Sequence, residues 1–206
     1  MTRSHAYHPD RLLPAEPGVR DIARRLLAHV EDLPIISPHG HLDPAMFVDD
    51  EPFPDPTALL ISPDHYLTRV LHSAGVELAD LGVGGHDCVP REAWRIFCSR
   101  FDLYAGTASG YWLEQEFAHV FGIDPERLTA DNADEVYDEL ATILAQPDFR
   151  PRALAERFGL EVLATTDDPL DDLAAHRALA EDPSFTSRVL PTFRPDAYTK
   201  MYKPEF

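Results

Sequence analysis

The sequence predicts an α/β protein whose parallel strands are joined by helices, with an all-helical region after the first strand. An apolar run at 160–165 is followed by a helical pattern at 170–179 and a second apolar run at 189–193. This order of strand, helix and strand is typical of a parallel βαβ unit. A further buried strand is expected far upstream, at 33–37, which gives the sheet three parallel strands.

The composition is that of a globular protein with an acidic surface. Hydrophobic residues make up 44% of the 206 residues, enough to bury a core, and 36 acidic residues against 18 Lys and Arg give a formal net charge of -18. This charge repels phosphate backbones and anionic membranes, so we expect neither nucleic acid nor a membrane as a partner. Residues 1–13 lack the apolar core of a signal peptide, and no later run suits a membrane span, which predicts a cytoplasmic protein.

Lys and Cys are both scarce in this sequence, which limits the residues that can bind an anion or form a disulfide or metal site. The sequence has only two Lys, so Arg must bind any anionic ligand. Its two cysteines, Cys88 and Cys98, stand in no CxxC or Cys/His cluster, and we expect both to be buried free thiols.

Helices are expected both before and after the first strand. Apolar residues recur every three or four positions over 17–30, which predicts an amphipathic helix with one buried face. The proline-rich and acidic stretch 43–63 predicts an irregular surface segment. Ser62, Pro63 and Gly75 are placed to cap, begin and end the next helix. Further helical patterns lie at 91–101, 111–120, 134–144 and 152–158.

These elements divide the chain into three parts. Residues 1–42 hold the N-terminal helix and the first strand, residues 43–159 form a mainly helical insertion, and residues 160–206 continue the sheet. Three strands are too few to close an eight-stranded barrel, and nothing in residues 198–206 would finish a domain. We therefore expect a truncated chain.

The first strand runs directly into Pro38-His39-Gly40-His41. Side chains two positions apart in an extended segment leave the same face, so the two imidazoles can share one metal ion. The spacing alone is weak evidence, because 10 His among 206 residues supply about half of one such pair by chance. Position is stronger evidence, since the C-terminal ends of strands carry the active sites of α/β barrels. We interpret His39 and His41 as metal or substrate ligands; hydrogen bonds within a loop are the alternative.

A second polar group opens the helix after Pro63. His65, Tyr66 and Arg69 fall within about one and a half helical turns. His can move protons near neutral pH, Tyr can donate to a sugar oxygen, and Arg can bind a carboxylate through two parallel hydrogen bonds. The pattern fits equally well an exposed helix start in which Tyr66 packs inward.

Two more polar stretches stand at the ends of the later strands. Thr165-Thr166-Asp167-Asp168 is best explained by capping of the following helix. Three residues that follow are expected on a solvated face or in a local ion pair: Asp171, Asp172 and His176. Arg194 lies between two prolines that stiffen it, so it suits anion recognition, and equally a structural pair with Asp196.

Taken in order, these motifs resemble those of uronate isomerases, which belong to the amidohydrolase-like barrel families. The resemblance runs along most of the chain, and its last two stretches together are quite specific. Its stretches are His39-Gly40-His41, Asp64-His65-Tyr66-x-x-Arg69, Tyr111-Trp112-Leu113-Glu114 leading to Phe121-Gly122-Ile123, Thr165-Thr166-Asp167-Asp168-Pro169 with His176, and Leu190-Pro191-Thr192-Phe193-Arg194-Pro195-Asp196. Gly40 departs from the family pattern, in which Cys or another residue often separates the two histidines.

The resemblance implies a (β/α)₈ TIM barrel with a helical insertion after its first strand, which agrees with the helical region read from the residues. Family members are roughly twice as long as this chain. The chain would then hold the N-terminal part of the barrel and lack the later strand-end Asp expected as the base. The implied reaction interconverts D-glucuronate with D-fructuronate, and D-galacturonate with D-tagaturonate, by proton transfer between C2 and C1 through an enediol.

The resemblance also implies roles for six residues. His39 and His41 would hold a zinc ion. Arg194 and Arg69 would bind the anionic hexuronate, and His65 and Tyr66 would bond or relay protons at the sugar oxygens. We also expect a homo-oligomer.

Two alternatives stay open. A metal-dependent hydrolase of an amide or lactone would use the same histidine pair through a metal-bound water, although two Arg-bearing motifs favour an anionic sugar. The chain could also be an inactive fragment, which predicts an exposed apolar barrel edge.

Overall fold

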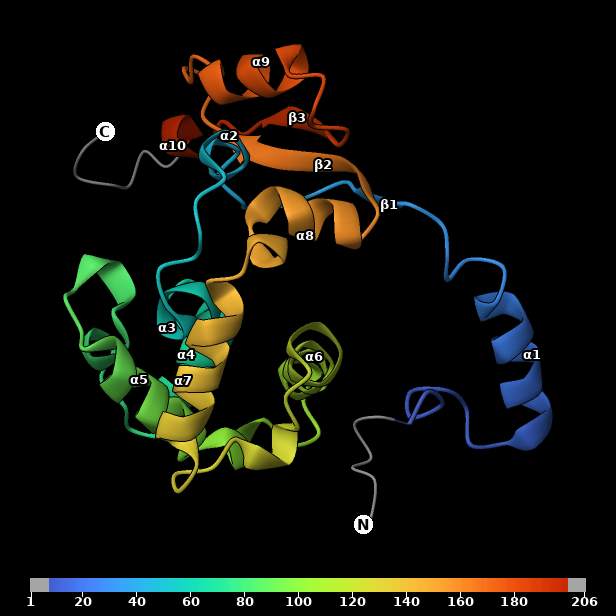
Figure 1. Ribbon diagram of the computed structural model, residues 1–206, viewed down its shortest axis with the longest axis vertical. Helices are drawn as coiled ribbons and strands as arrows, with labels where there is room; N and C mark the ends of the chain where they lie inside the picture. Colours follow the sequence, from blue (N-terminus) through green and yellow to red (C-terminus); the bar gives the residue numbers. More distant parts are fainter. Residues whose placement is uncertain (1–7, 200–206) are drawn as a thin grey trace. The chain divides into compact units, whose positions relative to one another are not determined.

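The computed structural model describes residues 8–199, which fold as two compact units. The helical unit comprises the described chain up to Leu26 together with Phe53–Gln146. The sheet unit comprises Leu27–Pro52 and the described chain from Pro147 onward. Figure 1 labels the α-helices and strands of both units.

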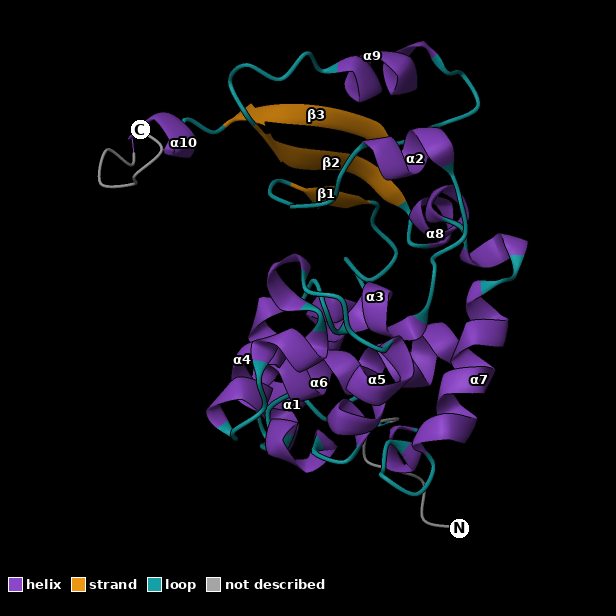
Figure 2. Cartoon of the chain, turned by 90° about the vertical axis from the view of Figure 1, so that its left-hand side faces the viewer, coloured by secondary structure: helices purple, strands orange, loops and turns teal. Residues whose placement is uncertain are grey.

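The sheet unit is built on a three-stranded parallel sheet in the order β1-β2-β3 (Figure 2). Its strands are β1 (Ile35–Ser37), β2 (Leu160–Asp167) and β3 (Arg188–Phe193). The expected parallel strands and the βαβ order are confirmed, with α9 (Ala174–Glu181) connecting β2 to β3. In register, Leu163 pairs with both Ser37 and Val189. The C-terminal ends of all three strands therefore meet at one edge of the sheet.

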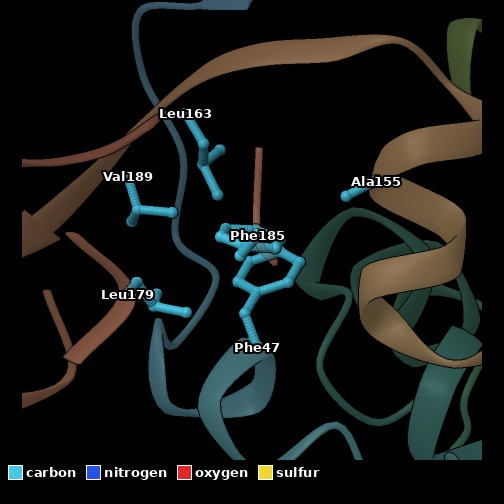
Figure 3. Packing of buried hydrophobic residues seen from close by; sticks show 6 residues of the cluster. All are labelled: Phe47, Ala155, Leu163, Leu179, Phe185 and Val189. Carbon is cyan, nitrogen blue, oxygen red and sulfur yellow. The ribbon is translucent and has the colours of Figure 1, made fainter. Parts of the chain in front are cut away.

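One face of the sheet is covered by short helices. A cluster of buried side chains joins the sheet to α2 (Ala45–Asp49), α8 (Pro151–Arg157) and α9 (Figure 3). Its members are Phe47, Ala155, Leu163, Leu179, Phe185 and Val189. Because side chains alternate along a strand, Thr165 and Asp167 share the face of Leu163, whereas Thr166 lies on the opposite face. Helices α2 and α8 fall within the range 43–159 but belong with the strands. The sheet unit also contains two short helices, η7 (Pro147–Phe149) and α10 (Asp196–Thr199).

The helical unit packs around aromatic side chains. Trp94, Phe97 and Phe117 are fully buried, and the Trp94 indole donates to the carbonyl oxygen of Ala133 at 2.9 Å. The elements of this unit are α1 (Pro17–Leu27), α3 (Pro56–Leu60), α4 (His65–Ser73), η2 (Leu78–Leu81), η3 (Val83–Gly85), α5 (Pro90–Cys98), η4 (Phe101–Tyr104), α6 (Ala108–Gln115), η5 (Glu116–Phe121), η6 (Pro125–Arg127) and α7 (Ala133–Leu144). The helical stretches predicted from periodicity correspond to α5, α6 with the π-helix η5, α7 and, in the sheet unit, α8.

The start of α4 differs from the prediction. Asp64, and not Ser62, is its N-cap: the carboxylate accepts from the amides of Tyr66 at 2.8 Å and Leu67 at 3.2 Å. The Ser62 hydroxyl instead donates to the carbonyl oxygen of Leu81 at 2.8 Å, which removes it from the helix start. Gly75 follows the helix with a φ of 90°, a conformation that favours glycine, so the predicted end is confirmed.

The prediction of an irregular segment at 43–63 is wrong, because α2 and α3 both lie there. Helix α3 has Pro56 in its first turn and Asp55 as its N-cap, with the carboxylate accepting from the amides of Thr57 at 2.8 Å and Ala58 at 3.0 Å. A proline at the first helical position costs no hydrogen bond, since its missing N–H would have no partner within the helix. Proline and aspartate therefore start a helix here.

Two apolar faces expected to be buried are exposed within the described residues. Helix α1 (Pro17–Leu27) forms within the predicted range 17–30 and ends three residues earlier, but none of its residues is buried, and Ile22 is exposed. On β1, Ile36 is 63% exposed, so this strand is not a buried one. An amphipathic pattern specifies which face is apolar but does not supply the element that covers it. No helix of the described chain is long and apolar enough to cross a membrane.

The two cysteines differ in burial. Cys98 is a buried free thiol, as predicted, whereas Cys88 is only partly buried. Burial raises the pKa of the Cys98 thiol to about 12, because the apolar surroundings disfavour the thiolate.

Candidate functional site

The two histidines after β1 converge on one point. Their Nε2 atoms lie 3.1 Å apart, and their rings are perpendicular with centroids 4.8 Å apart. In a tetrahedral zinc site with bonds of ~2.0–2.1 Å, two nitrogen ligands are separated by roughly 3.3 Å. His39 and His41 therefore fit two positions of such a site. The same separation also allows a hydrogen bond between the two rings.

His41 is tied to the neighbouring strand. Its Nδ1 lies 3.0 Å from the hydroxyl oxygen of Thr166 on β2, and the same hydroxyl donates to the carbonyl oxygen of Gly40 at 3.2 Å. A Cβ atom on Gly40 would lie 3.1 Å from the carbonyl oxygen of Ala164 and 3.3 Å from the Leu163 side chain. Glycine between the histidines thus lets this loop lie close against β2.

Arg194 is brought to the same edge by β3. Its amide donates to the carbonyl oxygen of Asp167 at 3.2 Å, which continues the pairing of β2 with β3. Its guanidinium binds the carboxylate of Asp196 through Nε, and its Nη1 lies 3.5 Å from His41 Nδ1. The predicted structural pair with Asp196 therefore exists, and it holds the guanidinium beside the histidine pair.

A buried polar network lies near this edge, on the face of β2 that carries Leu163, Thr165 and Asp167. The Thr165 hydroxyl donates to Asp167 Oδ2 at 2.8 Å, and the amide of Thr192 donates to the same oxygen at 3.1 Å. His176 Nε2 lies 2.8 Å from the Thr165 hydroxyl and 3.6 Å from Asp167 Oδ1. His176 is only 7% exposed, so its predicted place on a solvated face is wrong, while the local ion pair fits. Residues on α9, β2 and β3 are thereby joined.

The prediction that this stretch caps the following helix is wrong, because the N-cap of α9 is Leu173, which makes no side-chain hydrogen bond, and the nearby carboxylates form turns instead. Asp168 accepts from the amide of Leu170 at 2.9 Å, and Asp172 accepts from that of Ala174, the first residue of α9, at 2.8 Å. Asp168 also accepts from the hydroxyl of Tyr198 at 2.8 Å, and this hydrogen bond raises the pKa of that phenol. One signal in the sequence could have shown that Thr165 and Asp167 act together and apart from Thr166. Side chains alternate along a strand, so these two residues share a face that Thr166 does not.

No group of three His, Cys, Asp or Glu residues within 8–199 could hold a metal ion. His39 and His41 therefore supply only a pair of ligands in the described chain, and a complete zinc site requires at least one more ligand.

The other three predicted site residues belong to the helical unit. His65 and Tyr66 begin α4, with ring centroids 4.2 Å apart. Tyr66 is 54% exposed, while the next residue, Leu67, is buried, so the alternative in which Tyr66 packs inward is wrong. Arg69 is also exposed, one turn further along. The structure thus brings His39, His41 and Arg194 together. The participation of His65, Tyr66 and Arg69 in the same site stays a prediction.

Comparisons with known proteins give one consistent answer. The model of the glucuronate isomerase family matches residues 19–206. Uronate isomerases of Corynebacterium efficiens and Corynebacterium glutamicum are each 77% identical to this chain, over 99% and 98% of its length. The chain spans only 44% and 40% of the lengths of these two curated relatives.

Solved structures agree with the sequence comparison. The crystal structure of glucuronate isomerase from Caulobacter crescentus matches 97% of this chain, and 42% of its own length, with a TM-score of 0.91 and 46% identity. That of uronate isomerase from Thermotoga maritima matches 89% of this chain, and 39% of its own length, with a TM-score of 0.77 and 27% identity. Because the family model matches residues 19–206, nearly the whole of this chain, the chain belongs to the glucuronate isomerase family.

Proposed function

We propose that this chain supplies part of the active site of an isomerase that interconverts D-glucuronate with D-fructuronate, and D-galacturonate with D-tagaturonate. The names of its relatives, glucuronate and uronate isomerase, support this reaction. The observation that carries the proposal is the meeting of His39, His41 and Arg194 at the C-terminal edge of three parallel strands. Active sites of (β/α)₈ barrels lie at this edge, and we propose that the three strands form part of such a barrel.

The reaction requires the chain to bind an anion and to help move protons. A base removes the proton from C2 of the aldehyde form, an enediol forms, and C1 receives a proton while another passes from O2 to O1. We assign binding of the substrate carboxylate to Arg194 and Arg69, because a guanidinium can bind a carboxylate through two hydrogen bonds. We assign proton relay and hydrogen bonding at the sugar oxygens to His65 and Tyr66. We assign no residue of this chain to the base at C2.

We propose that His39 and His41 hold a zinc ion through their Nε2 atoms. Bound zinc would supply a positive charge that polarises a sugar oxygen. The 3.1 Å separation of the two Nε2 atoms supports this assignment. Assembly into a homo-oligomer and location in the cytoplasm stay predictions.

The isomerase activity is tested with the product of the complete gene. Incubation with D-glucuronate in D₂O should yield a keto acid and deuterium exchange at C2, both followed by NMR. Arg194→Ala should raise KM at least about tenfold, the cost of roughly one lost charged hydrogen bond. Arg188→Ala is the matched control, because Arg188 begins the same strand at its opposite end. Hydrolysis of an amide or lactone without exchange at C2 would mean that the protein is a hydrolase.

The zinc site is tested on the product of the complete gene, because His39 and His41 supply only a pair of ligands within 8–199. The purified protein, titrated with zinc, should bind one ion per polypeptide, measured by elemental analysis after desalting. His39→Ala and His41→Ala should each abolish this binding, whereas His29→Ala, at an exposed position, should retain it. Stoichiometric zinc in the variant lacking both His39 and His41 would show that the ligands lie elsewhere.

A further inference from the structure

The Thr166 hydroxyl has a single proton and two partners. Its oxygen lies 3.2 Å from the carbonyl oxygen of Gly40 and 3.0 Å from His41 Nδ1. A carbonyl oxygen can only accept, so the hydroxyl must donate its proton there to make that bond. To keep both hydrogen bonds, the hydroxyl then has to accept from His41, and the ring must carry its proton on Nδ1.

We propose that Thr166 is a positioning residue that holds His41 in the tautomer protonated at Nδ1, which leaves the Nε2 lone pair free. This Nε2 atom lies 3.1 Å from Nε2 of His39. Metal-binding histidines are held in this way by a hydrogen-bond acceptor at their second ring nitrogen. The consequence for zinc rests on the proposed function, whereas the tautomer itself depends only on the hydrogen bonds of Thr166.

The strand, and not the loop, holds this hydroxyl in place. Thr166 pairs with Thr192 of β3 in register, and the next pair, Asp167 with Phe193, also belongs to the ladder, so the backbone of Thr166 is fixed. Its side chain lies on the face opposite to the Thr165 and Asp167 network, because side chains alternate along a strand. The close approach of Gly40 to Ala164 brings the loop within reach of the hydroxyl. The Thr166 hydroxyl can therefore form hydrogen bonds with both Gly40 and His41 in the observed backbone conformation.

Arg194 provides the competing arrangement. Its Nη1 lies 3.5 Å from His41 Nδ1, at the outer limit of a hydrogen bond, and a guanidinium can only donate. If Arg194 donated to Nδ1, the ring would carry its proton on Nε2 and could not bind a metal through that atom. The Thr166 contact is shorter than the Arg194 contact, and the hydroxyl can keep its bond to Gly40 only if it accepts from Nδ1–H, so the first arrangement is favoured. Removing the hydroxyl should therefore release the ring to the second tautomer.

The tautomer is measured on the chain without metal. Long-range ¹H–¹⁵N NMR distinguishes the two neutral forms of an imidazole, and the signal of His41 is assigned by its loss in His41→Ala. The unsubstituted chain should show His41 protonated at Nδ1, and Thr166→Ser should preserve this form. Thr166→Val should give the Nε2-protonated form or a mixture. Thr142→Val is the control, since the Thr142 hydroxyl donates to a carbonyl oxygen within α7.

Zinc affinity provides the second measurement, by competition with a chelator of known affinity. Thr166→Val should weaken binding by about 10- to 100-fold, the usual effect of losing such a partner, while Thr166→Ser should stay close to the unsubstituted chain. If Thr166→Val fails to fold, Thr166→Ala makes the same two predictions. An unchanged His41 tautomer in the folded hydroxyl-free variant would overturn the proposal. A changed tautomer in a chain that binds no zinc would instead support Thr166 and contradict the proposed metal site.

Discussion

The hydroxyl of Thr165 and the Nε2 atom of His176 lie 2.8 Å apart inside the sheet unit. Thr165 is 1% exposed, so neither group can exchange its partner for water. Through Asp167, this pair is linked to the amide of Thr192 on β3. The network therefore holds the ends of β2 and β3 together beneath the edge that carries Arg194.

Replacing His176 should destabilise the sheet unit. His176→Ala leaves the Thr165 hydroxyl with one partner fewer and opens a cavity, which should lower the free energy of unfolding by about 1–3 kcal/mol. Urea unfolding followed by circular dichroism measures the change. His29→Ala, at an exposed position, is the control and should have no effect. Equal stability of the two variants would show that the network contributes nothing to the fold.

Gly110 should not tolerate alanine, although it lies inside helix α6. Glycine to alanine normally stabilises a helix by about 1 kcal/mol. Here a Cβ atom would lie 2.1 Å from the backbone carbonyl oxygen of Tyr104, so Gly110→Ala should instead destabilise the helical unit by about 1–3 kcal/mol. Trp fluorescence during urea unfolding reports on this unit. At Gly18 of α1 the nearest atoms belong to the flexible end of Glu16, so Gly18→Ala should be neutral or stabilising; a similar effect of both substitutions would contradict the clash.

The two thiols should differ in reactivity. Burial raises the pKa of Cys98 to about 12, so almost no thiolate is present at pH 8, and the side chain is also shielded from reagents. Cys88 is partly buried and should react with a thiol reagent first. In the folded chain Cys88→Ser should therefore abolish the fast phase of labelling, whereas Cys98→Ser should leave it intact. A fast phase that survives in Cys88→Ser would place the reactive thiol at Cys98.

Asp182 should make stability depend on acid pH. Hydrogen bonds from the Ser184 hydroxyl at 2.6 Å, from Arg152 at 2.6 Å and from the Ser184 amide at 2.9 Å lower the pKa of this carboxyl from 3.8 to about 2. A pKa lowered by folding adds stability above the unfolded value, and this contribution is lost as pH falls from about 4 to about 2.

The matching experiment compares Asp182→Asn with the unsubstituted chain over pH 2 to 7. The variant should unfold at lower urea concentration at neutral pH, and the difference between the two chains should shrink below about pH 4. Asp148→Asn, at an exposed position, should show no such pattern. If the difference in stability between the two chains stays constant down to pH 2, the ionised Asp182 carboxylate contributes nothing to the free energy of unfolding.

Local patterns predicted most elements well but placed some boundaries wrongly. The connecting helix was expected over 170–179, yet α9 begins at Ala174. The residues before it form turns, because the carboxylates of Asp168, Asp171 and Asp172 accept from backbone amides two positions ahead. Short polar side chains compete for the backbone in this way, and periodicity alone does not detect it.

Sequence by itself determined the parallel βαβ order, the shared face of His39 and His41, and the resemblance to uronate isomerases, because these depend on spacing along the chain. Tertiary structure decided which residues surround the pair. Thr166 lies 125 positions from His41, and Arg194 lies 153 positions from it. Only the register of β1, β2 and β3 brings such distant residues within hydrogen-bonding distance. The burial of His176 has the same origin, since it depends on how α9 packs against a strand whose side chains alternate between two faces.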